Sequence, residues 1–337
     1  IKVWNKNHLV MPNGTGLLGD SSSTQSAIIV PKPNSSTLFY VFTVDELGKS
    51  NGLQYSIIDL SLDGGLGDII TKNVPLQTPA LEKITTVQHA NGIDVWVIAH
   101  KYGNNQFVSY LLSATGLTTT PVISAVGSVI MNDSQRTLGY LKSSPDGEYV
   151  AIAHSGTNSN VQLLKFNNAS GQLTLLSNML VNSNSLGAYG IEFSSNSKVL
   201  YVSRIDYPSF TSEIFQYNLA IENESTINAS RITIANYVFD LFNEGIITAL
   251  QLAPNQKIYV ARNNSDFLDV INNPNTVGLG CQYALNAVDL FPNTAYFGLP
   301  SFITSYLDLN FISSNFCIGN PTQFLLPQIN DIVSVTW

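Results

Sequence analysis

The chain has 337 residues, of which 44% are hydrophobic and 11% are charged, and its formal net charge at pH 7 is −8. This composition excludes intrinsic disorder, which goes with few apolar and many charged residues. The chain has no cluster of Lys or Arg that could follow a phosphate backbone, and no apolar run long enough to span a bilayer. We therefore expect neither nucleic acid as a partner nor insertion into a membrane.

A hairpin pattern recurs along the chain. In residues 141–153, two apolar runs flank the turn Pro145-Asp146-Gly147. Pro presets φ at the first corner of such a turn, Asp bonds its own backbone, and Gly takes a positive φ without steric penalty. Related patterns lie at residues 28–42, 86–98, 191–202 and 250–261. They recur at intervals of roughly 50 to 60 residues, which is near the spacing of propeller blades.

The strands that follow the turns are apolar on both faces and rich in Val, Ile, Tyr and Phe, which indicates strands buried between neighbouring sheets. The sequence therefore predicts an all-β protein with β-propeller architecture. In chain order, we expect the outer part of an incomplete first blade in residues 1–20. Full blades are then predicted at residues 23–77, 82–130, 137–182, 186–238 and 246–290.

A sixth inner strand is predicted at residues 298–306, and no segment shows a helical period. Because an open propeller exposes unpaired strand edges, we predict seven blades in the intact protein, with the first blade incomplete in this chain. After about residue 310 the pattern changes, and residues 316–324 and 332–337 are typical of the opening strands of an immunoglobulin-like sandwich. We therefore divide the chain into a propeller, 1–312, and a truncated second domain, 313–337.

The two cysteines, Cys281 and Cys317, are too few for a disulfide framework and lack metal-ligand spacing. A bridge between them is allowed outside the cell, and two inert thiols are the alternative.

Several segments resemble the N-terminal propeller of large Bacteroidetes cell-surface proteins. They are residues 4–14, 23–33, 60–68, 252–261, 270–275 and 298–302. Members of that family are exported by type IX secretion and are often described as gliding-motility-associated or adhesin-like. The resemblance covers about residues 1–312, and residues 316–337 resemble the start of the PKD-type repeats that follow the propeller in that family. It implies a secreted or bacterial cell-surface location and covalent continuity with further β-sandwich repeats, but it assigns no catalytic residues.

Polar residues follow the second strand of successive blades. They are Asp45, His100, His154, Arg204 and Arg262, with Tyr102, Asp206 and Tyr207 close by in the sequence. Because loops at the same position in each blade gather on one face, we expect the first five side chains to form a partial ring around the channel mouth, with the other three beside it. Arg binds carboxylate or sulfate through two hydrogen bonds, and Tyr stacks on sugars. The ring thus predicts an anionic or polyhydroxylated ligand, an extracellular glycan or a surface protein.

Plainer interpretations stand beside this one. Strand ends meet water and carry polar residues in any sheet, and function has to be argued from a site. His100, His154 and Asp45 could hold a metal ion, but histidines on different blades without fixed spacing are typical of solvated or hydrogen-bonded groups, so we expect no metal and no cofactor. Three aspartates around Gly64-Gly65, namely Asp59, Asp63 and Asp68, lack the periodicity of a calcium loop and indicate a hairpin turn.

We therefore interpret the chain as a non-catalytic binding or adhesion module of a large secreted bacterial protein, linked to gliding or surface attachment. A propeller enzyme of the lactonase or polysaccharide-lyase type, using the His and Arg side chains, is the alternative. Paired acids do not converge on the ring, since only Asp45 and Asp206 are near it, on blades that are not adjacent. A structural head without a ligand is a third interpretation. A smooth, uncharged channel mouth would favour it.

Overall fold

Each predicted hairpin forms two adjacent strands of one sheet. In residues 141–154, β10 (Leu141–Ser143) pairs antiparallel with β11 (Tyr149–His154), with Leu141 opposite Ile152. Gly147 takes the positive φ of 71° that the turn requires. The Ser144 hydroxyl accepts a hydrogen bond of 2.9 Å from the Tyr149 N–H, which closes the hairpin. Local turn chemistry therefore sets the register of these strands.

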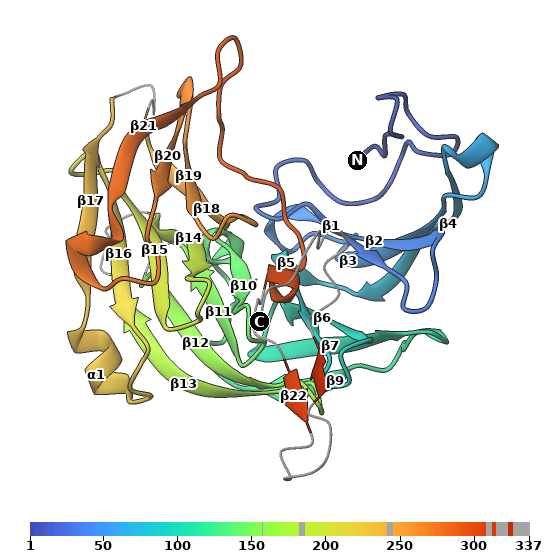
Figure 1. Cartoon of the computed structure of the whole chain (residues 1–337), viewed down its shortest axis with the longest axis horizontal. Helices are drawn as coiled ribbons and strands as arrows, with labels where there is room; N and C mark the ends of the chain where they lie inside the picture. The colour runs from blue at the N-terminus through green and yellow to red at the C-terminus, as the bar shows by residue number, and fades with distance from the viewer. Residues whose placement is uncertain (157, 182–185, 241–244, 308–311, 315–322, 326–337) are drawn as a thin grey trace.

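The computed structural model describes residues 1–156, 158–181, 186–240, 245–307, 312–314 and 323–325. Within them, four four-stranded sheets and one five-stranded sheet are arranged as blades around one axis (Figure 1). The predicted β-propeller fold is thus confirmed. The number of blades in the intact protein stays a prediction.

In four blades the strands follow one another from the axis outward, and in blade 2 the last two strands, β8 and β9, both pair with β7. Blade 1 consists of β1 (Ala27–Pro31), β2 (Leu38–Val44), β3 (Leu53–Asp59) and β4 (Asp68–Gln77). Blade 2 consists of β5 (Ala80–Gln88), β6 (Val95–Lys101), β7 (Gln106–Ser113), β8 (Gly116–Leu117) and β9 (Val122–Ala125). Blade 3 adds β12 (Asn160–Asn167) and β13 (Gln172–Leu180) to β10 and β11. Blade 4 consists of β14 (Gly187–Phe193), β15 (Val199–Asp206), β16 (Thr211–Asn218) and β17 (Ile232–Val238). Blade 5 consists of β18 (Ile247–Leu252), β19 (Ile258–Arg262), β20 (Phe267–Ile271) and β21 (Tyr283–Asp289).

The hydrophobic core lies between blades, as the two-sided apolar strands predict. Phe42 of β2 packs with Val95 and Val97 of β6, between blades 1 and 2. Its neighbour Val41 faces the other way and packs with Ile58. Since side chains alternate along a strand, each sheet contributes to two cores.

Residues 1–18 cover the face of blade 1 that is turned away from blade 2. Val3, Met11 and Leu17 pack there against Val41 and Ile58. The prediction of outer blade strands here is wrong: apart from one bridge between Trp4 and Val10, this segment has no strand pairing. The Asn5 carboxamide oxygen accepts from the N–H groups of Asn7 and Leu9. This side-chain bonding folds the segment back on itself, so its backbone is not extended.

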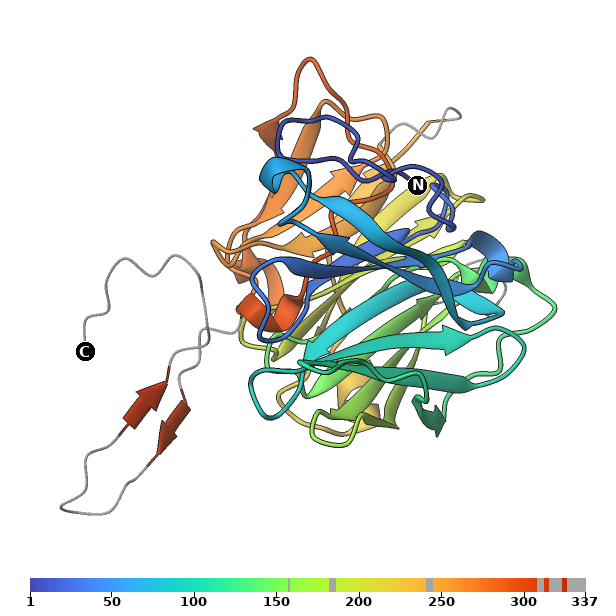
Figure 2. The ribbon, with the colours of Figure 1, turned by 90° about the vertical axis from the view of Figure 1, so that its right-hand side faces the viewer.

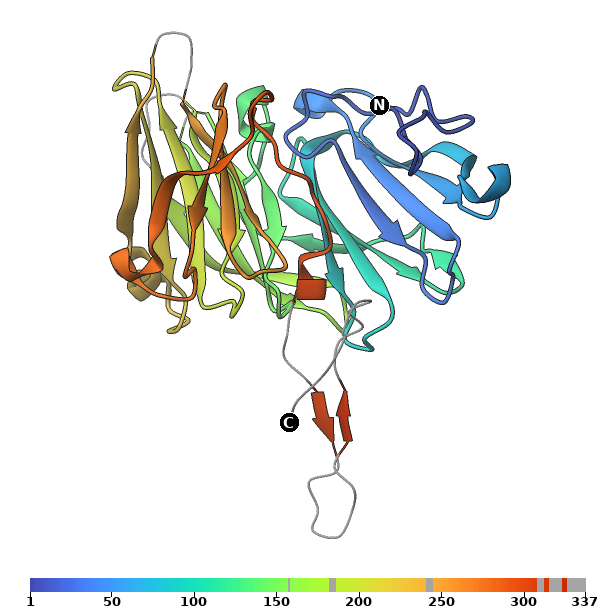
Figure 3. The same ribbon diagram turned by 45° about the horizontal axis from the view of Figure 1, so that its top comes forward.

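Residues 295–307, which we call the crossing segment, run between the first and last blades (Figures 1 and 3). The predicted sixth inner strand at residues 298–306 is wrong. The segment is irregular and ends in the 3₁₀ helix η5 (Thr304–Leu307). Its polar groups bond instead to other inner strands: the Ser305 hydroxyl accepts from the Gln88 N–H at 3.0 Å, and the Leu299 N–H donates to the Tyr140 hydroxyl at 3.4 Å.

Short helical elements connect some strands. The chain has 3₁₀ helices η1 (Glu46–Gly48), η2 (Asp63–Gly65), η3 (Ser134–Thr137) and η4 (Gly278–Cys281). The absence of helix was also predicted wrongly, because α1 (Glu224–Ala229) interrupts blade 4 and is capped by the Asn223 side chain, which accepts from the Thr226 N–H. Six residues are too few to show a period.

The C-terminal part is described only in β22 (Ile312–Ser314) and β23 (Gln323–Leu325), which pair antiparallel and are drawn apart from the blades in Figure 2. The remainder of the predicted second domain, 313–337, lies outside the described residues, so the sandwich stays a prediction. Cys317 lies there as well. Cys281 is buried in the core between blades 4 and 5, where burial raises the pKa of its thiol.

Candidate functional site

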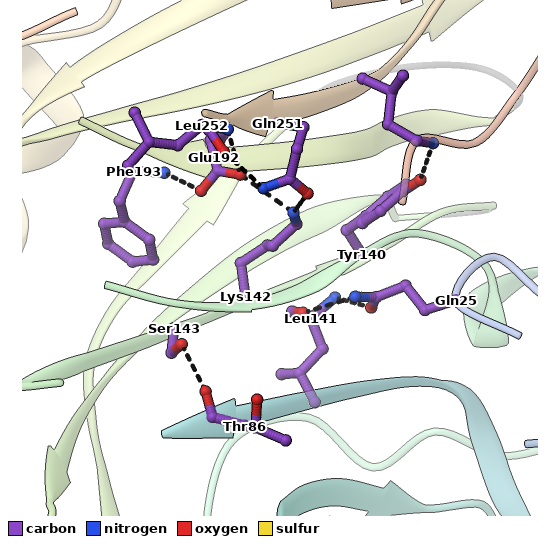
Figure 4. A network of polar contacts seen from close by, with 11 residues as sticks. Gln25, Thr86, Tyr140, Leu141, Lys142, Ser143, Glu192, Phe193, Gln251 and Leu252 are labelled. Atoms are coloured by element: carbon purple, nitrogen blue, oxygen red, sulfur yellow. Dashed lines mark hydrogen bonds and ion pairs between the residues drawn. The ribbon is translucent and has the colours of Figure 1, made fainter. Parts of the chain in front are cut away.

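Buried polar side chains of the inner strands form a network at the axis (Figure 4). The Lys142 ammonium lies 3.0 Å from a Glu192 carboxylate oxygen and donates to the Gln251 carboxamide oxygen at 2.6 Å, which links blades 3, 4 and 5. The same Glu192 carboxylate accepts from the Leu252 N–H. On the other side, the Gln25 carboxamide bonds both the N–H and the carbonyl of Leu141. We call this set the axial network. Its groups bond to one another, so it is a structural element.

A second buried cluster on β5 links blade 2 to blade 1 through Glu82 and to blade 3 through Lys83. The Glu82 carboxylate accepts from the Thr24 hydroxyl at 2.7 Å and from the N–H groups of Thr24 and Leu47. Next to it, the Lys83 ammonium donates to the carbonyls of Leu138 and Ala153. Burial lowers the pKa of Lys83 to about 7; the nearby Glu82 carboxylate opposes that shift.

His100 and His154 are the two predicted site residues that the structure brings together. Their ring centroids lie 6.0 Å apart, and both side chains are fully buried. Each Nδ1 faces a backbone carbonyl, that of Lys101 for His100 and that of Arg136 for His154. A carbonyl only accepts, so Nδ1 carries the proton and each Nε2 presents a lone pair. Within the described residues neither Nε2 has a hydrogen-bond partner.

Burial strongly disfavours charge on this histidine pair. It lowers the pKa of His100 to about 3 and holds the pKa of His154 well below its usual range. The nearby Lys83 ammonium shifts both pKa values in the same direction. The two imidazoles are therefore neutral at pH 7. In the parts of the chain that the structure describes, no three His, Cys, Asp or Glu residues are grouped so as to hold a metal.

The other predicted site residues of blades 1 and 2 have structural contacts. The Asp45 carboxylate is buried and accepts from the N–H groups of Glu46 and Asn51, so it holds the loop around η1. Tyr102 lies against Gly48 of the same loop, where a Cβ would meet its ring at 2.8 Å.

The predicted arginines are ion-paired. Arg204 lies 2.6 Å from the Glu213 carboxylate on the neighbouring strand and 3.2 Å from that of Asp206. Arg262 lies 2.9 Å from the buried Asp269 carboxylate. Tyr207 packs edge-on against Phe239.

Most of these residues therefore have buried or ion-paired contacts, and the ring around the channel mouth stays a prediction. They lie at the end of the second strand of each blade or directly after it, whereas the first strand lies at the axis. The two arginines pair there with acids on the third strand of their own blades. Whether any of them binds a ligand stays a prediction.

A pocket of about 680 Å³ opens at the mouth, beside the crossing segment. We call it the mouth pocket. It is lined by Ser21, Ser22, Ser23, Thr24, Gln25, Ser26, Ala27, Leu138, Leu186, Tyr189, Tyr296, Phe297, Gly298, Leu299, Pro300 and Ser301. Among these described residues there is no carboxylate, imidazole, amine or guanidinium. The lining is hydroxyl-rich and aromatic.

Hydrogen bonds and ring contacts with other residues fix the walls of the mouth pocket. Thr24 and Gln25 are fixed by Glu82 and Leu141, as described above, and the Thr248 hydroxyl donates to the Tyr296 carbonyl at 3.2 Å. Tyr189 contacts Phe297 edge-on, with ring centroids 5.7 Å apart. The Tyr296 side chain is 62% exposed, and Ser21 and Ser22 are exposed as well. The pocket thus combines a fixed floor with an accessible aromatic ring and hydroxyls.

Sequence reasoning missed this pocket. Its signals were the serine-rich run 21–26 before the first inner strand and the adjacent aromatics Tyr296 and Phe297. Only the fold places these segments together, since they lie at opposite ends of the propeller sequence.

A second hollow of about 540 Å³, the rim pocket, lies between blade 3 and the connection before α1. Its lining includes Asp146, Glu148, Tyr149, Lys165 and Glu222. The Glu222 carboxylate accepts from the Tyr149 hydroxyl and pairs with the Lys165 ammonium. Burial is the main cause that raises the pKa of Tyr149, and the Glu222 carboxylate raises it further. The Tyr149 hydroxyl is therefore protonated at pH 7. Tyr149, Lys165 and Glu222 are thus bonded to one another.

Comparisons with known proteins agree with the fold. The Dos1 propeller matches with a TM-score of 0.51 at 12% identity, over 87% of this chain and 65% of that one. Sqt1 of Saccharomyces cerevisiae matches with a TM-score of 0.43 at 15% identity, over 75% and 61% of the two chains. The periplasmic gluconolactonase of Pseudomonas aeruginosa matches with a TM-score of 0.40 at 12% identity, over 77% and 84%. The chain spans less than two thirds of the Dos1 and Sqt1 chains.

At such identities the similarity concerns the fold alone, which is that of a β-propeller. No protein-family model matches the sequence, and no curated protein matches it either. No helix in the described residues has the length and apolar character needed to cross a membrane.

Proposed function

We propose that this propeller is a non-catalytic binding module and that the mouth pocket binds a neutral saccharide. One observation carries the proposal: the lining pairs hydroxyl groups with aromatic rings, of which that of Tyr296 is exposed, and, within its described residues, has no ionisable group other than tyrosine. Sugars present hydroxyls that donate and accept hydrogen bonds and C–H faces that pack on aromatic rings. Concave sites of this size, with few placed polar groups, are typical of small-ligand binding.

The biological setting that we propose follows from the sequence resemblance. A propeller at the N-terminal end of a secreted bacterial cell-surface protein, exported by type IX secretion and followed by PKD-type repeats, would use this pocket to attach the cell to a glycan, in gliding or in adhesion. The described lining of the mouth is uncharged, as a structural head without a ligand would have it, but the mouth is hollowed and not smooth, which favours binding over that alternative.

An enzyme would need acid–base groups at its substrate. The His and Arg side chains that a lactonase or lyase mechanism would use are buried or ion-paired, and the mouth pocket supplies none. The rim pocket does contain carboxylates, a Lys and a Tyr, so it is the place where turnover would have to occur if the protein were an enzyme.

The test is a screen against neutral and acidic oligosaccharides, with the parent protein, a Tyr296→Ala variant and a Trp4→Ala variant. Trp4 is a matched control because its ring is 55% exposed and lies outside the pocket lining. We expect binding of neutral sugars by the parent and the Trp4 variant, and about tenfold weaker binding by the Tyr296 variant.

The bound sugar should be recovered unchanged. Release of products that stops in a Glu222→Gln variant would replace the proposal with the enzymatic alternative. Absence of binding to any glycan would overturn it.

A further inference from the structure

A small notch opens on the outer edge of the propeller between blades 3 and 4. It has a volume of about 270 Å³ and is lined by Asn178, Leu180, Tyr217, Asn228 and Arg231. Asn178 and Leu180 belong to β13, Tyr217 to β16 and Asn228 to α1, while Arg231 directly precedes β17. The notch is thus separate from the mouth pocket, and none of its residues takes part in the function proposed above.

The Tyr217 hydroxyl is the first unusual feature of the notch. Tyr217 is 1% exposed, and its hydroxyl donates a hydrogen bond to no described residue, while the Arg231 guanidinium lies beside it on the donor side. Buried polar atoms are nearly always bonded, because an unpaired one loses its bonds to water without replacement. Burial raises the pKa of this hydroxyl, and the nearby Arg231 guanidinium opposes the shift. The hydroxyl therefore keeps its proton and is available to donate it.

The second feature is an uncompensated cation. The chain has four arginines, and Arg204 and Arg262 are ion-paired while Arg136 donates to the Asn160 carboxamide. Arg231 makes no ion pair with any described residue, and its guanidinium carbon lies 4.9 Å from the centre of the Phe215 ring. The face of Phe215 orients the planar guanidinium and leaves its N–H groups for a ligand.

The Glu224 carboxylate, which lies beside the notch, already has a hydrogen-bond partner. The Glu224 carboxylate accepts from the Asn178 N–H at 3.0 Å. The Asn178 and Asn228 side chains at the notch are neutral amides, which can donate as well as accept. The notch therefore presents a guanidinium, a phenolic O–H and amide N–H groups at one place.

We propose that this notch binds a compact oxyanion, the carboxylate or sulfate group of an acidic ligand. The Arg231 guanidinium supplies two parallel N–H donors that match two oxygens of such a group, and charge-assisted bonds of this kind are the strong ones. The Tyr217 hydroxyl then donates to an oxygen of the anion, which gives its O–H group the acceptor that the described residues do not supply.

The number of arginines makes the test direct. Protein labelled with ¹⁵N-arginine has four Nε–Hε signals, one for each arginine, and the one that an Arg231→Lys variant lacks belongs to Arg231. Sodium sulfate and, separately, sodium acetate are titrated against sodium chloride at equal ionic strength. We expect a saturable shift of the Arg231 signal alone. Saturation by sulfate only identifies a tetrahedral group, and saturation by acetate only a planar carboxylate.

A Tyr217→Phe variant separates binding from structure. It removes a hydroxyl without leaving an unpaired partner, so the midpoint of thermal unfolding should stay or rise, while the anion binds about fivefold more weakly. The matched control is Tyr110→Phe, whose hydroxyl donates to the distant Leu76 carbonyl and whose loss should not change anion affinity. The proposal is overturned if neither anion gives a saturable shift, if the four signals move together, or if Tyr217→Phe binds like the parent. None of these readouts involves the mouth pocket.

Discussion

The axial network and the mouth pocket lie at two depths of the same axis, yet their chemistry is opposite. At the axis, the charged side chains Lys83, Lys142, Glu82 and Glu192 are each at most 3% exposed, and each is bonded. At the mouth there is space, and its described lining carries no charged group. Gln25 belongs to both regions, because its carboxamide bonds Leu141 and the residue also lines the pocket.

This difference shows how the polar residues of the inner strands are divided between structure and recognition. A buried charge is tolerated only where its partners are in place, so the charged groups of the axis have no capacity left for a ligand. Neutral hydroxyls and aromatic rings cost little when they are left exposed, and they can be offered to a ligand. Substitutions at the axis should therefore change stability, and substitutions at the mouth should change binding.

The largest effect is expected from breaking the axial ion pair. Glu192→Ala leaves the Lys142 ammonium buried without its carboxylate and the Leu252 N–H without an acceptor. We expect the free energy of unfolding to fall by about 3–5 kcal/mol, measured by urea denaturation. The double variant Lys142→Met, Glu192→Leu should recover most of that loss, since no isolated charge remains. A single variant as stable as the parent would show that the axial pair does not hold the blades.

Acid should act through the histidine pair. Both folded-state pKa values lie below the ordinary value, so the unfolded chain binds more protons between about pH 6.5 and pH 3. Stability is therefore fully present above about pH 6.5 and is lost as the pH falls, by about 2 kcal/mol between pH 7 and pH 5 through His100, and His154 acts in the same direction.

The measurement is the urea midpoint as a function of pH for the parent and for His154→Gln. The variant should show a clearly smaller loss between pH 7 and pH 5, and His8→Gln is the control, because His8 lies in an exposed N-terminal turn. Equal pH slopes for all three proteins would contradict the burial of a neutral pair.

The smallest effect on stability is expected at the mouth. Tyr296→Ala removes a ring that is 62% exposed and leaves the bond from Thr248 to the Tyr296 backbone carbonyl in place. The free energy of unfolding should change by less than about 0.5 kcal/mol, while sugar binding weakens. A large loss of stability would mean that this ring supports the crossing segment and does not serve a ligand.

Much of the fold could be predicted from the sequence because the signals are local. Turn residues such as Pro145 and Gly147 and the strands beside them set five hairpins, and repetition of the hairpin predicts blades. His100 and His154 are neighbours because they hold equivalent positions in adjacent blades. The crossing segment could not be predicted, since its bonds reach residues as remote as Gln88 from Ser305.

The site was harder to predict because the availability of a side chain depends on residues that lie elsewhere in the sequence. Arg204 and Arg262 looked available for a ligand, but each has an acid on the next strand, Glu213 opposite Arg204 and Asp269 near Arg262. An acid placed seven to nine residues after the arginine, across the hairpin, is a sequence signal of such pairing. The mouth pocket had only weak signals, a serine run and two aromatics.

The most direct test of the central claim is the salt dependence of sugar binding. The oligosaccharide that binds best in the screen is titrated calorimetrically into the parent protein at about 50 mM and about 500 mM sodium chloride. Because the described lining of the mouth pocket is uncharged, the dissociation constant should change by less than about twofold. A weakening of tenfold or more would contradict the account, since it would place the ligand on the protein's charged groups instead of in the neutral mouth.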